Sequence, residues 1–225
     1  AFVVLLVVHA IVMAALAKKN LDRPTADGRK IVRHEAVDRW FHWLMAASIL
    51  ALIFTGVSPI LGLRVAWLEM HWMSGLLLTF LVVAHIIRAS FWQDFKSMLL
   101  VPKDFGEPFD SSRKPGKYYF EQKGMHWAVT VVTLAVIVTG VLMFMQIDTP
   151  FWDRTNSMAE DQLGLVFLLH GLSTLALVAL AATHIYFALR PEKIYYTRSM
   201  ISGWMSEDEL AANHDPGQWS PKEAD

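Results

Sequence analysis

Residues 163–189 read LGLVFLLHGLSTLALVALAATHIYFAL, a run without a single Asp, Glu, Lys or Arg. A helix that crosses the hydrocarbon core of a bilayer needs about 20 mostly apolar residues, so this run is long enough to span a membrane. Its only histidines are His170 and His184. Ionisable side chains inside a membrane are costly and mark functional sites by default. The stretch therefore predicts a membrane helix that carries two functional histidines.

The spacing of these two histidines suggests what they bind. His170 and His184 lie 14 residues apart. With 1.5 Å of rise per residue and 3.6 residues per turn, they stand about 21 Å apart on nearly the same helix face, one near each membrane surface. Two haems stacked through a bilayer need this arrangement, because each iron takes an axial imidazole at its own depth.

Other stretches of the chain are also apolar enough to cross a bilayer. Three of them are long: Trp40 to Leu61, Trp67 to Ile87 and His126 to Met145. A shorter one, Phe2 to Ala17, is expected to be an extra span, because no basic residues precede it as they would in a signal peptide. The sequence thus predicts an all-α fold, an integral membrane four-helix haem-binding bundle with an extra N-terminal transmembrane helix.

The composition agrees with a membrane protein and excludes several cofactors. Hydrophobic residues make up 54% of the chain, and the mean hydropathy is +0.35, which is too apolar for an ordinary soluble domain. The net charge of -1 argues against nucleic acid as a partner. Cysteine is absent, which excludes disulfides, thiolate zinc sites, covalent c-type haem and iron–sulfur clusters on this chain. Any redox cofactor must use histidine or methionine.

Basic residues alternate with the predicted spans and set the expected topology. Residues 18–39 and 88–123 are rich in Lys and Arg, whereas the turns at 64–69 and 148–161 are poor in them. The basic segments should face the cytoplasm. The expected organisation is a hydrophobic segment at 1–17, a basic cytoplasmic loop at 18–39, a di-haem domain at 40–189 that includes the cytoplasmic loop 88–123, and a cytoplasmic tail at 190–225.

Sorting the histidines by depth gives one clear ligand pair. The second span repeats the 14-residue spacing, with His71 at its outer end and His85 near its inner end. On the outer side only His71 and His170 are embedded, so they are the predicted ligands of an outer haem. On the inner side His184 has three candidate partners, which are His42, His85 and His126. Depth alone does not choose between them, although His126 is interpreted first as an interfacial residue.

Two further residue types fit a haem protein. Haem propionates are anionic and need cationic partners near the membrane faces, and Arg33, Arg39 and Arg88 stand at the inner face. Anchoring by the positive-inside rule is the competing role for these arginines. Gly56 and Gly140 lie within spans, where a small residue lets a helix or a flat porphyrin approach closely.

Five short stretches then resemble a known family. They are RWFHW at 39–43, MH at 70–71 with Gly75, GKY at 116–118 continuing to QK at 122–123, LLHG at 168–171 and THIY at 183–186. Between about residue 31 and about residue 205 the chain resembles the gamma subunit of respiratory formate dehydrogenases. That subunit belongs to the wider family of di-haem b cytochromes that also serves nickel–iron hydrogenases.

The resemblance implies specific ligands. It assigns His42 and His184 to a haem on the cytoplasmic side and His71 and His170 to the outer haem, with His85 as the alternative inner ligand. It also implies a quinone site, for menaquinone or ubiquinone, beside the inner haem, with Gln122 and His184 as candidates. The family's loop has Asn-Ala-Gly where this chain has residues 119–121, Tyr-Phe-Glu, so the expected asparagine contact is missing.

The expected function is electron transfer. As the resemblance implies, the chain would anchor a formate dehydrogenase-like complex in the lipid bilayer. It would pass electrons between an iron–sulfur subunit and the quinone pool, and the iron–sulfur subunit would in turn contact a catalytic oxidoreductase subunit. Quinone reduction is the only reaction expected on this chain. A hydrogenase or another molybdenum or tungsten oxidoreductase is the alternative partner. A membrane transporter or assembly anchor is the alternative of another class, although transporters tend to place polar sites near the midplane rather than at two depths.

Overall fold

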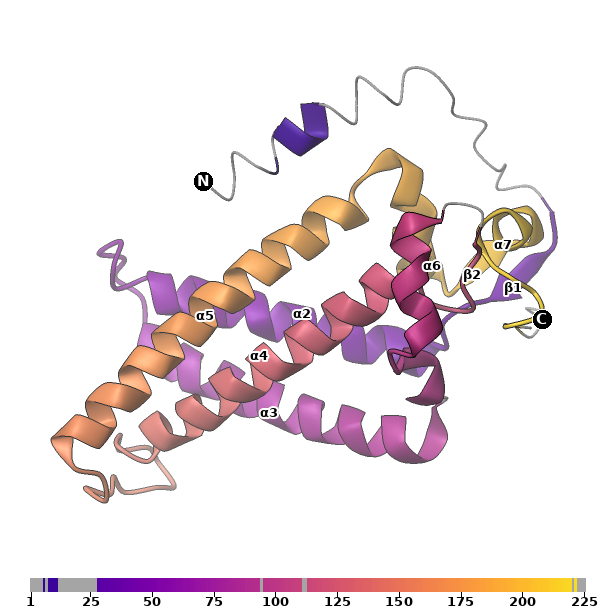
Figure 1. The fold of residues 1–225 in the computed structure, drawn as a ribbon. Coiled ribbons are helices and arrows are strands. Elements are labelled where there is room, and N and C mark those ends of the chain that lie inside the picture. The colour runs from indigo at the N-terminus through magenta and orange to yellow at the C-terminus, as the bar shows by residue number, and fades with distance from the viewer. Residues whose placement is uncertain are drawn as a thin grey trace. The chain divides into compact units, whose positions relative to one another are not determined.

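The computed structural model of the chain describes residues 6, 8–11, 28–93, 95–110, 113–219 and 221. Four helices in the described residues are long and apolar enough to cross a membrane: α2 (Ala36–Val57), α3 (Trp67–Trp92), α4 (Phe120–Phe144) and α5 (Glu160–Ala188) (Figure 1). They confirm the four predicted spans. Apart from residues 6 and 8–11, the extra span expected at 2–17 lies outside the described residues.

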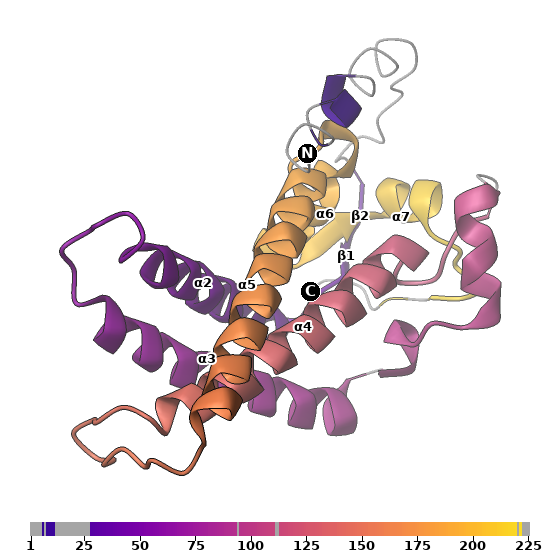
Figure 2. The same cartoon turned by 60° about the vertical axis from the view of Figure 1, so that its left-hand side comes forward.

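The helix ends differ from the predicted spans for local reasons. Helix α2 stops at Val57 rather than Leu61, because a turn follows in which Gly62 takes a φ of 67° and the Leu63 amide donates to the Ser58 carbonyl at 2.9 Å. This turn joins α2 to α3 (Figure 2). Helix α4 begins at Phe120, six residues before the predicted start, because the Glu107 carboxylate accepts a hydrogen bond from the Phe120 amide at 2.9 Å.

Helix α3 extends to Trp92, five residues beyond the predicted end of its span at Ile87. A separate 3-10 helix, η1, covers Phe95–Met98, and a second 3-10 helix, η2, covers Pro102–Phe109. The stretch expected as a cytoplasmic loop at 88–123 thus contains the end of α3, these two short helices and the start of α4.

The described residues form two compact units. The first, which we call the bundle unit, comprises Trp40–Phe95 and His126–Val178 and holds the greater part of the four long helices. The second, which we call the cap unit, comprises Ala1–Arg39, Lys96–Met125 and Ala179–Asp225.

Few residues of the four long helices are buried. In the most apolar window of each of the four spanning helices, only 11–17% of the residues are buried inside the protein. Outward apolar side chains are what a lipid environment requires. The few buried polar residues include Thr55 and Thr139, whose hydroxyls donate to the carbonyls of Ala51 and Ala135, each at 2.7 Å. These two buried hydroxyls are thus satisfied within their own helices.

The cap unit is a small folded structure. Strand β1 (Lys30–Val32) pairs antiparallel with strand β2 (Trp204–Ser206), so that Ile31 lies opposite Met205. Helix α6 (Ile194–Ser202) ends at Gly203, which takes a φ of 93°, and helix α7 (Glu207–Asn213) is capped by reciprocal bonds between Ser206 and Glu209. The hydrophobic core of the cap unit consists of Ile31, Tyr195, Met205 and Leu210, and Tyr196 and Trp219 pack against this core.

Candidate functional site

The two outer histidines face each other in the bundle unit. The rings of His71, on α3, and His170, on α5, have centres 6.3 Å apart and planes inclined by 73°. Both side chains are only partly exposed. The structure thus brings together the two residues that depth sorting predicted as the outer ligand pair.

Each of these histidines is held by a threonine on a neighbouring helix. The Thr55 hydroxyl of α2 lies 2.8 Å from His71 Nδ1, and the Thr139 hydroxyl of α4 lies 2.8 Å from His170 Nδ1. Because each hydroxyl already donates its proton to a carbonyl one turn earlier, it acts as an acceptor toward the imidazole. The proton of each neutral ring is therefore placed on Nδ1, and Nε2 keeps its lone pair for a metal.

A glycine follows each threonine and lies against the same ring. A Cβ atom on Gly56 would stand 3.6 Å from His71 Cε1, and one on Gly140 would stand 3.4 Å from His170 Cε1. The second distance is at the lower limit of an ordinary van der Waals contact. Thr-Gly is thus a repeated device in which the hydroxyl orients the imidazole and the missing side chain gives the ring room.

The geometry of the outer pair fits a haem iron. Two imidazole–metal bonds of about 2 Å, plus about 1.1 Å from each ring centre to its nitrogen, give a ring separation of about 6.2 Å. The observed separation is 6.3 Å. Within the described ranges, no group of three or more His, Cys, Asp or Glu side chains could share a metal ion. A haem needs only two axial ligands from the protein, because the porphyrin supplies four nitrogens.

The inner histidines are placed on three helices of the bundle unit and one segment of the cap unit. His42, on α2, packs edge-on against Trp43 with ring centres 5.1 Å apart. His184, on α5, belongs to the cap unit and has an exposed side chain. The pairing of His42 with His184 stays a prediction. His85, the alternative ligand, lies 6.1 Å from the Phe41 ring and 6.5 Å from the His126 ring.

Arg33, one of the candidate propionate partners, lies inside the cap unit. Only 3% of it is exposed. Its Nη2 donates to the Lys117 carbonyl at 2.9 Å, and its Nη1 lies 2.9 Å from His214 Nε2. Its guanidinium also stands 4.5 Å from the centre of the Tyr196 ring. The hydrogen-bond donors of Arg33 are thus engaged by groups of the cap unit. The role of Arg33 as a propionate partner stays a prediction.

The other two arginines are placed differently. Arg39 donates through Nη1 to the Ile201 carbonyl, while its buried Nε has no hydrogen-bond partner among the described residues. A buried, charged donor without an acceptor suits an anionic group, which supports the propionate prediction for Arg39. Arg88 lies on α3, one turn before the end of the helix.

The cap contains a histidine with a strongly shifted pKa. His214 is fully buried, and its Nδ1 lies 2.6 Å from the Gly116 carbonyl. Burial, followed by the charge of Arg33, lowers the pKa of His214 to about 4. Burial also lowers the pKa of Arg33. His214 is therefore neutral at physiological pH and accepts the Arg33 proton at Nε2.

The loop that resembles the family's quinone segment is held by local contacts. The Gln122 side-chain oxygen accepts from the Tyr119 amide at 3.1 Å, which caps the first turn of α4. Among the described residues, no hydrogen bond uses the amide nitrogen of Gln122. Lys123 forms a 2.8 Å ion pair with Asp104 of η2, and these side chains are only 10% and 1% exposed. The candidate quinone residue therefore sits on a helix start that is fixed by a buried ion pair.

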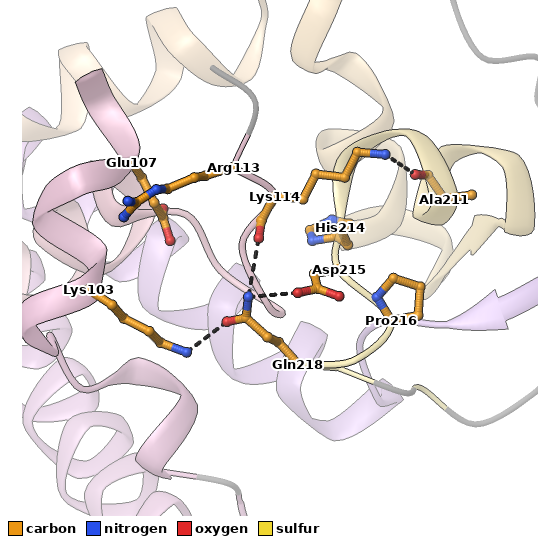
Figure 3. Close-up of a pocket in the computed structure, with 9 residues that line it drawn as sticks. All are labelled: Lys103, Glu107, Arg113, Lys114, Ala211, His214, Asp215, Pro216 and Gln218. Atoms are coloured by element: carbon orange, nitrogen blue, oxygen red, sulfur yellow. Dashed lines mark hydrogen bonds between the residues drawn. The ribbon is translucent and has the colours of Figure 1, made fainter. Parts of the chain in front are cut away.

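A polar hollow of about 520 Å³ lies elsewhere in the cap unit. On its wall the Gln218 side chain accepts a hydrogen bond from Lys103 at 2.7 Å and donates one to Asp215 at 2.8 Å (Figure 3). Arg113 and Lys114 also line it. None of the predicted haem or quinone residues lines this hollow.

Sequence reasoning missed several residues of the site. Gly56 and Gly140 were singled out in the sequence, but Thr55 and Thr139 were not. The dipeptide Thr-Gly occurs at both 55–56 and 139–140, and this repetition could have identified the threonines. His126 was interpreted as an interfacial residue, whereas in the structure its ring centre lies 6.5 Å from that of His85. Asp104 gave no signal, because its partner Lys123 is 19 residues away and resembles any cytoplasmic lysine.

Comparison with known proteins agrees with this geometry. The chain is 25% identical over 212 residues to the formate dehydrogenase cytochrome b556 subunit of Haemophilus influenzae, which covers 86% of this chain and 84% of that protein. It is 24% identical over 204 residues to the formate dehydrogenase cytochrome b556(fdo) subunit of Escherichia coli K12, covering 82% and 90%. Residues 33–203 match the family described as prokaryotic cytochrome b561. With its four spanning helices and facing histidines, the chain belongs to the prokaryotic cytochrome b561 family, as a multi-pass b-haem protein of the bacterial inner membrane.

Proposed function

We propose that this chain is the membrane-anchoring di-haem cytochrome b subunit of a formate dehydrogenase-like complex, and that it carries electrons between an iron–sulfur partner and the quinone pool. The observation that carries the proposal is the outer pair, in which His71 and His170 face each other at 6.3 Å with both Nδ1 atoms held by threonine hydroxyls. Bound between such ligands, a haem supplies reversible one-electron chemistry.

The roles of the protein residues follow from their positions. His71 and His170 would hold the outer haem through Nε2, and Thr55 and Thr139 keep both rings in the required tautomer. For the inner haem, the family resemblance supports His184 with His42, and His85 is the alternative. The spare Nε donor of Arg39 would bind a propionate on this side.

The quinone end is proposed at the start of α4. The amide nitrogen of Gln122 is a hydrogen-bond donor suited to a quinone carbonyl, and the exposed ring of His184 is the second candidate. The buried Asp104–Lys123 pair would keep this helix start rigid. Either menaquinone or ubiquinone would serve.

The partner is proposed from the relatives. Both are formate dehydrogenase subunits, and the chain covers 84% and 90% of their lengths, which supports a formate dehydrogenase-like partner over a hydrogenase or another molybdenum or tungsten enzyme. Because this chain has no cysteine, the iron–sulfur clusters must belong to another subunit.

Haem content and redox spectra of the purified protein test the proposal. The pyridine haemochrome assay should give at least two b haems per chain, and His71→Ala and His170→Ala should each lose the same one. The double variant should lose no more than either single variant, because one iron needs both ligands. A parent protein without haem after haem-sufficient expression would refute the cytochrome function and favour a transporter or assembly anchor.

Electron transfer is tested separately. Added reduced quinone analogue should reduce the haems of the parent protein, and Gln122→Ala should slow this reduction while leaving the haem content unchanged. Equal rates in both proteins would remove Gln122 from the quinone site without affecting the haem assignment.

A further inference from the structure

A second pair of imidazoles lies in the bundle unit. The rings of His85, on α3, and His126, on α4, have centres 6.5 Å apart and planes inclined by 68°. The outer pair has almost the same geometry, with 6.3 Å and 73°. Helices α3 and α4 thus present a second pair of facing imidazoles, and its ring separation and inclination match those of the outer pair.

The second pair lies at its own depth. His85 follows His71 on α3 by 14 residues, which is about 21 Å along the helix. His126 precedes Thr139 on α4 by 13 residues, which is about 20 Å, and Thr139 contacts His170 of the outer pair. Measured along either helix, the second pair is therefore one haem level away from the first.

The ring separation suits one bridging metal atom. An aligned hydrogen bond between two imidazoles would bring the ring centres to about 5 Å, which is closer than the observed 6.5 Å. One metal with two bonds of about 2 Å gives about 6.2 Å. A bare metal ion would need more than two protein ligands, and no larger His, Cys, Asp and Glu cluster occurs in the part of the chain that the structure describes. A haem needs only these two.

The surroundings of the pair are aromatic. Phe41 packs against His85 with ring centres 6.1 Å apart, and Trp127 packs against His126 at 5.9 Å. Phe95 lies 6.1 Å from Trp127. Flat apolar rings suit the faces of a porphyrin and exclude water from its iron.

We propose that His85 and His126 are the two axial ligands of a haem held between α3 and α4. The proposal rests on the proposed function only in taking b haem as the cofactor. It adds His126 to the ligand set, and it places an inner haem on helices other than those of His42 and His184.

The test is haem stoichiometry in purified full-length variants. His85→Ala and His126→Ala should each contain one haem fewer than the parent protein, and the double variant should contain no fewer than either single one. His34→Ala, which removes a histidine of the cap unit, is the matched control and should keep every haem. Haem added together with imidazole should restore the lost low-spin spectrum in both single variants, because the imidazole replaces the missing ligand.

The outcomes separate the possibilities. A parent with three haems would make this site additional to His42 and His184, whereas a parent with two, both kept in His42→Ala, would make it the inner site itself; each supports the proposal. Full haem content and unchanged spectra in both single variants would overturn it and favour a water-bridged pair. Because His71→Ala and His170→Ala report on the outer haem, this failure is distinct from failure of the proposed function.

Discussion

Thr55 and Thr139 each contact one of the two histidines that we propose as ligands of the outer haem. A neutral imidazole can carry its proton on either nitrogen, and only the Nδ1 form leaves Nε2 for the metal. Each threonine selects that form, because its own proton is committed to a carbonyl one turn earlier. The hydroxyl is therefore a fixed acceptor rather than a rotating one.

Replacing Thr55 with valine should weaken the outer haem. The β-branched shape is kept, but His71 Nδ1 loses its acceptor, and loss of such an outer-shell partner typically costs 10- to 100-fold in metal affinity, so a decrease of about that size is expected. Haem titration of the apoprotein measures the affinity, and a redox titration should show a shifted midpoint potential for one haem only. Thr55→Ser should restore both values.

Thr79 provides the matched control for this prediction. Its hydroxyl makes the same bond to a carbonyl one turn earlier, that of Gly75 at 2.8 Å, and within the described part of the chain it forms no hydrogen bond to a histidine. Thr79→Val should therefore leave the haem affinity and potential unchanged. An equal loss in Thr79→Val and Thr55→Val would mean that helix geometry, not the imidazole contact, causes the effect.

Gly140→Val tests the room beside the second ligand. Even a Cβ atom at this position would lie 3.4 Å from His170 Cε1, so the larger side chain should displace the ring and cause loss of the outer haem. Gly164→Val, on α5, is the control, because a Cβ there meets nothing within 4 Å. Difference spectra of the two purified variants decide the matter, and an intact outer haem in Gly140→Val would contradict the close packing.

At the scale of single elements, the start of α4 depends on one buried ion pair. Asp104→Asn would leave Lys123 with an uncompensated charge at only 10% exposure, and breaking a buried pair in this way costs about 3–5 kcal/mol. Amide hydrogen exchange should therefore quicken in residues 101–125. The exposed pair Arg113–Asp110 offers the comparison, since Asp110→Asn should change stability by about 1 kcal/mol or less.

The cap should lose stability in acid because of His214. Its pKa is about 4 in the folded protein against an ordinary value of 6.5, so between these pH values the unfolded state binds the extra proton and the folded state does not. Stability is therefore complete above about pH 6.5 and falls as the pH drops to about 4, by about 3 kcal/mol at most. Hydrogen exchange in residues 194–214 measures this, and His214→Gln should flatten the profile. An unchanged slope in that variant would assign the acid sensitivity to another group.

The elements differ in how far the sequence could predict them. The four spans follow from long apolar runs, and the outer pair follows from the positions of His71 and His170, because helical rise fixes depth whatever the packing. The pairing of residues 30–32 with 204–206 could not be read from the sequence, since strands this short carry no periodic signal. Nor could the partner of His126, because phase around a helix axis does not say which neighbouring helix faces it.

For the whole molecule, the expected topology places the loop of residues 148–161 outside and the cap inside. The chain has no cysteine, so single substitutions report position without a background. Ser157→Cys and Ala212→Cys are both at exposed positions. In intact cells an impermeant thiol reagent should label the first and not the second, and after lysis both. Labelling of the second in intact cells would invert the topology.

The pairing of β1 with β2 also determines when the cap unit can fold during synthesis of the chain. More than 170 residues separate Val32 from Trp204, and a ribosome that adds about 5–20 residues per second needs roughly 10–30 s to make them. All four spans emerge during this interval, while β1 still has an unpaired edge open to stray association. Insertion of the helices thus precedes closure of the cap, and a chain whose synthesis stalls before residue 204 cannot form that strand pair, leaving β1 exposed to quality-control proteases.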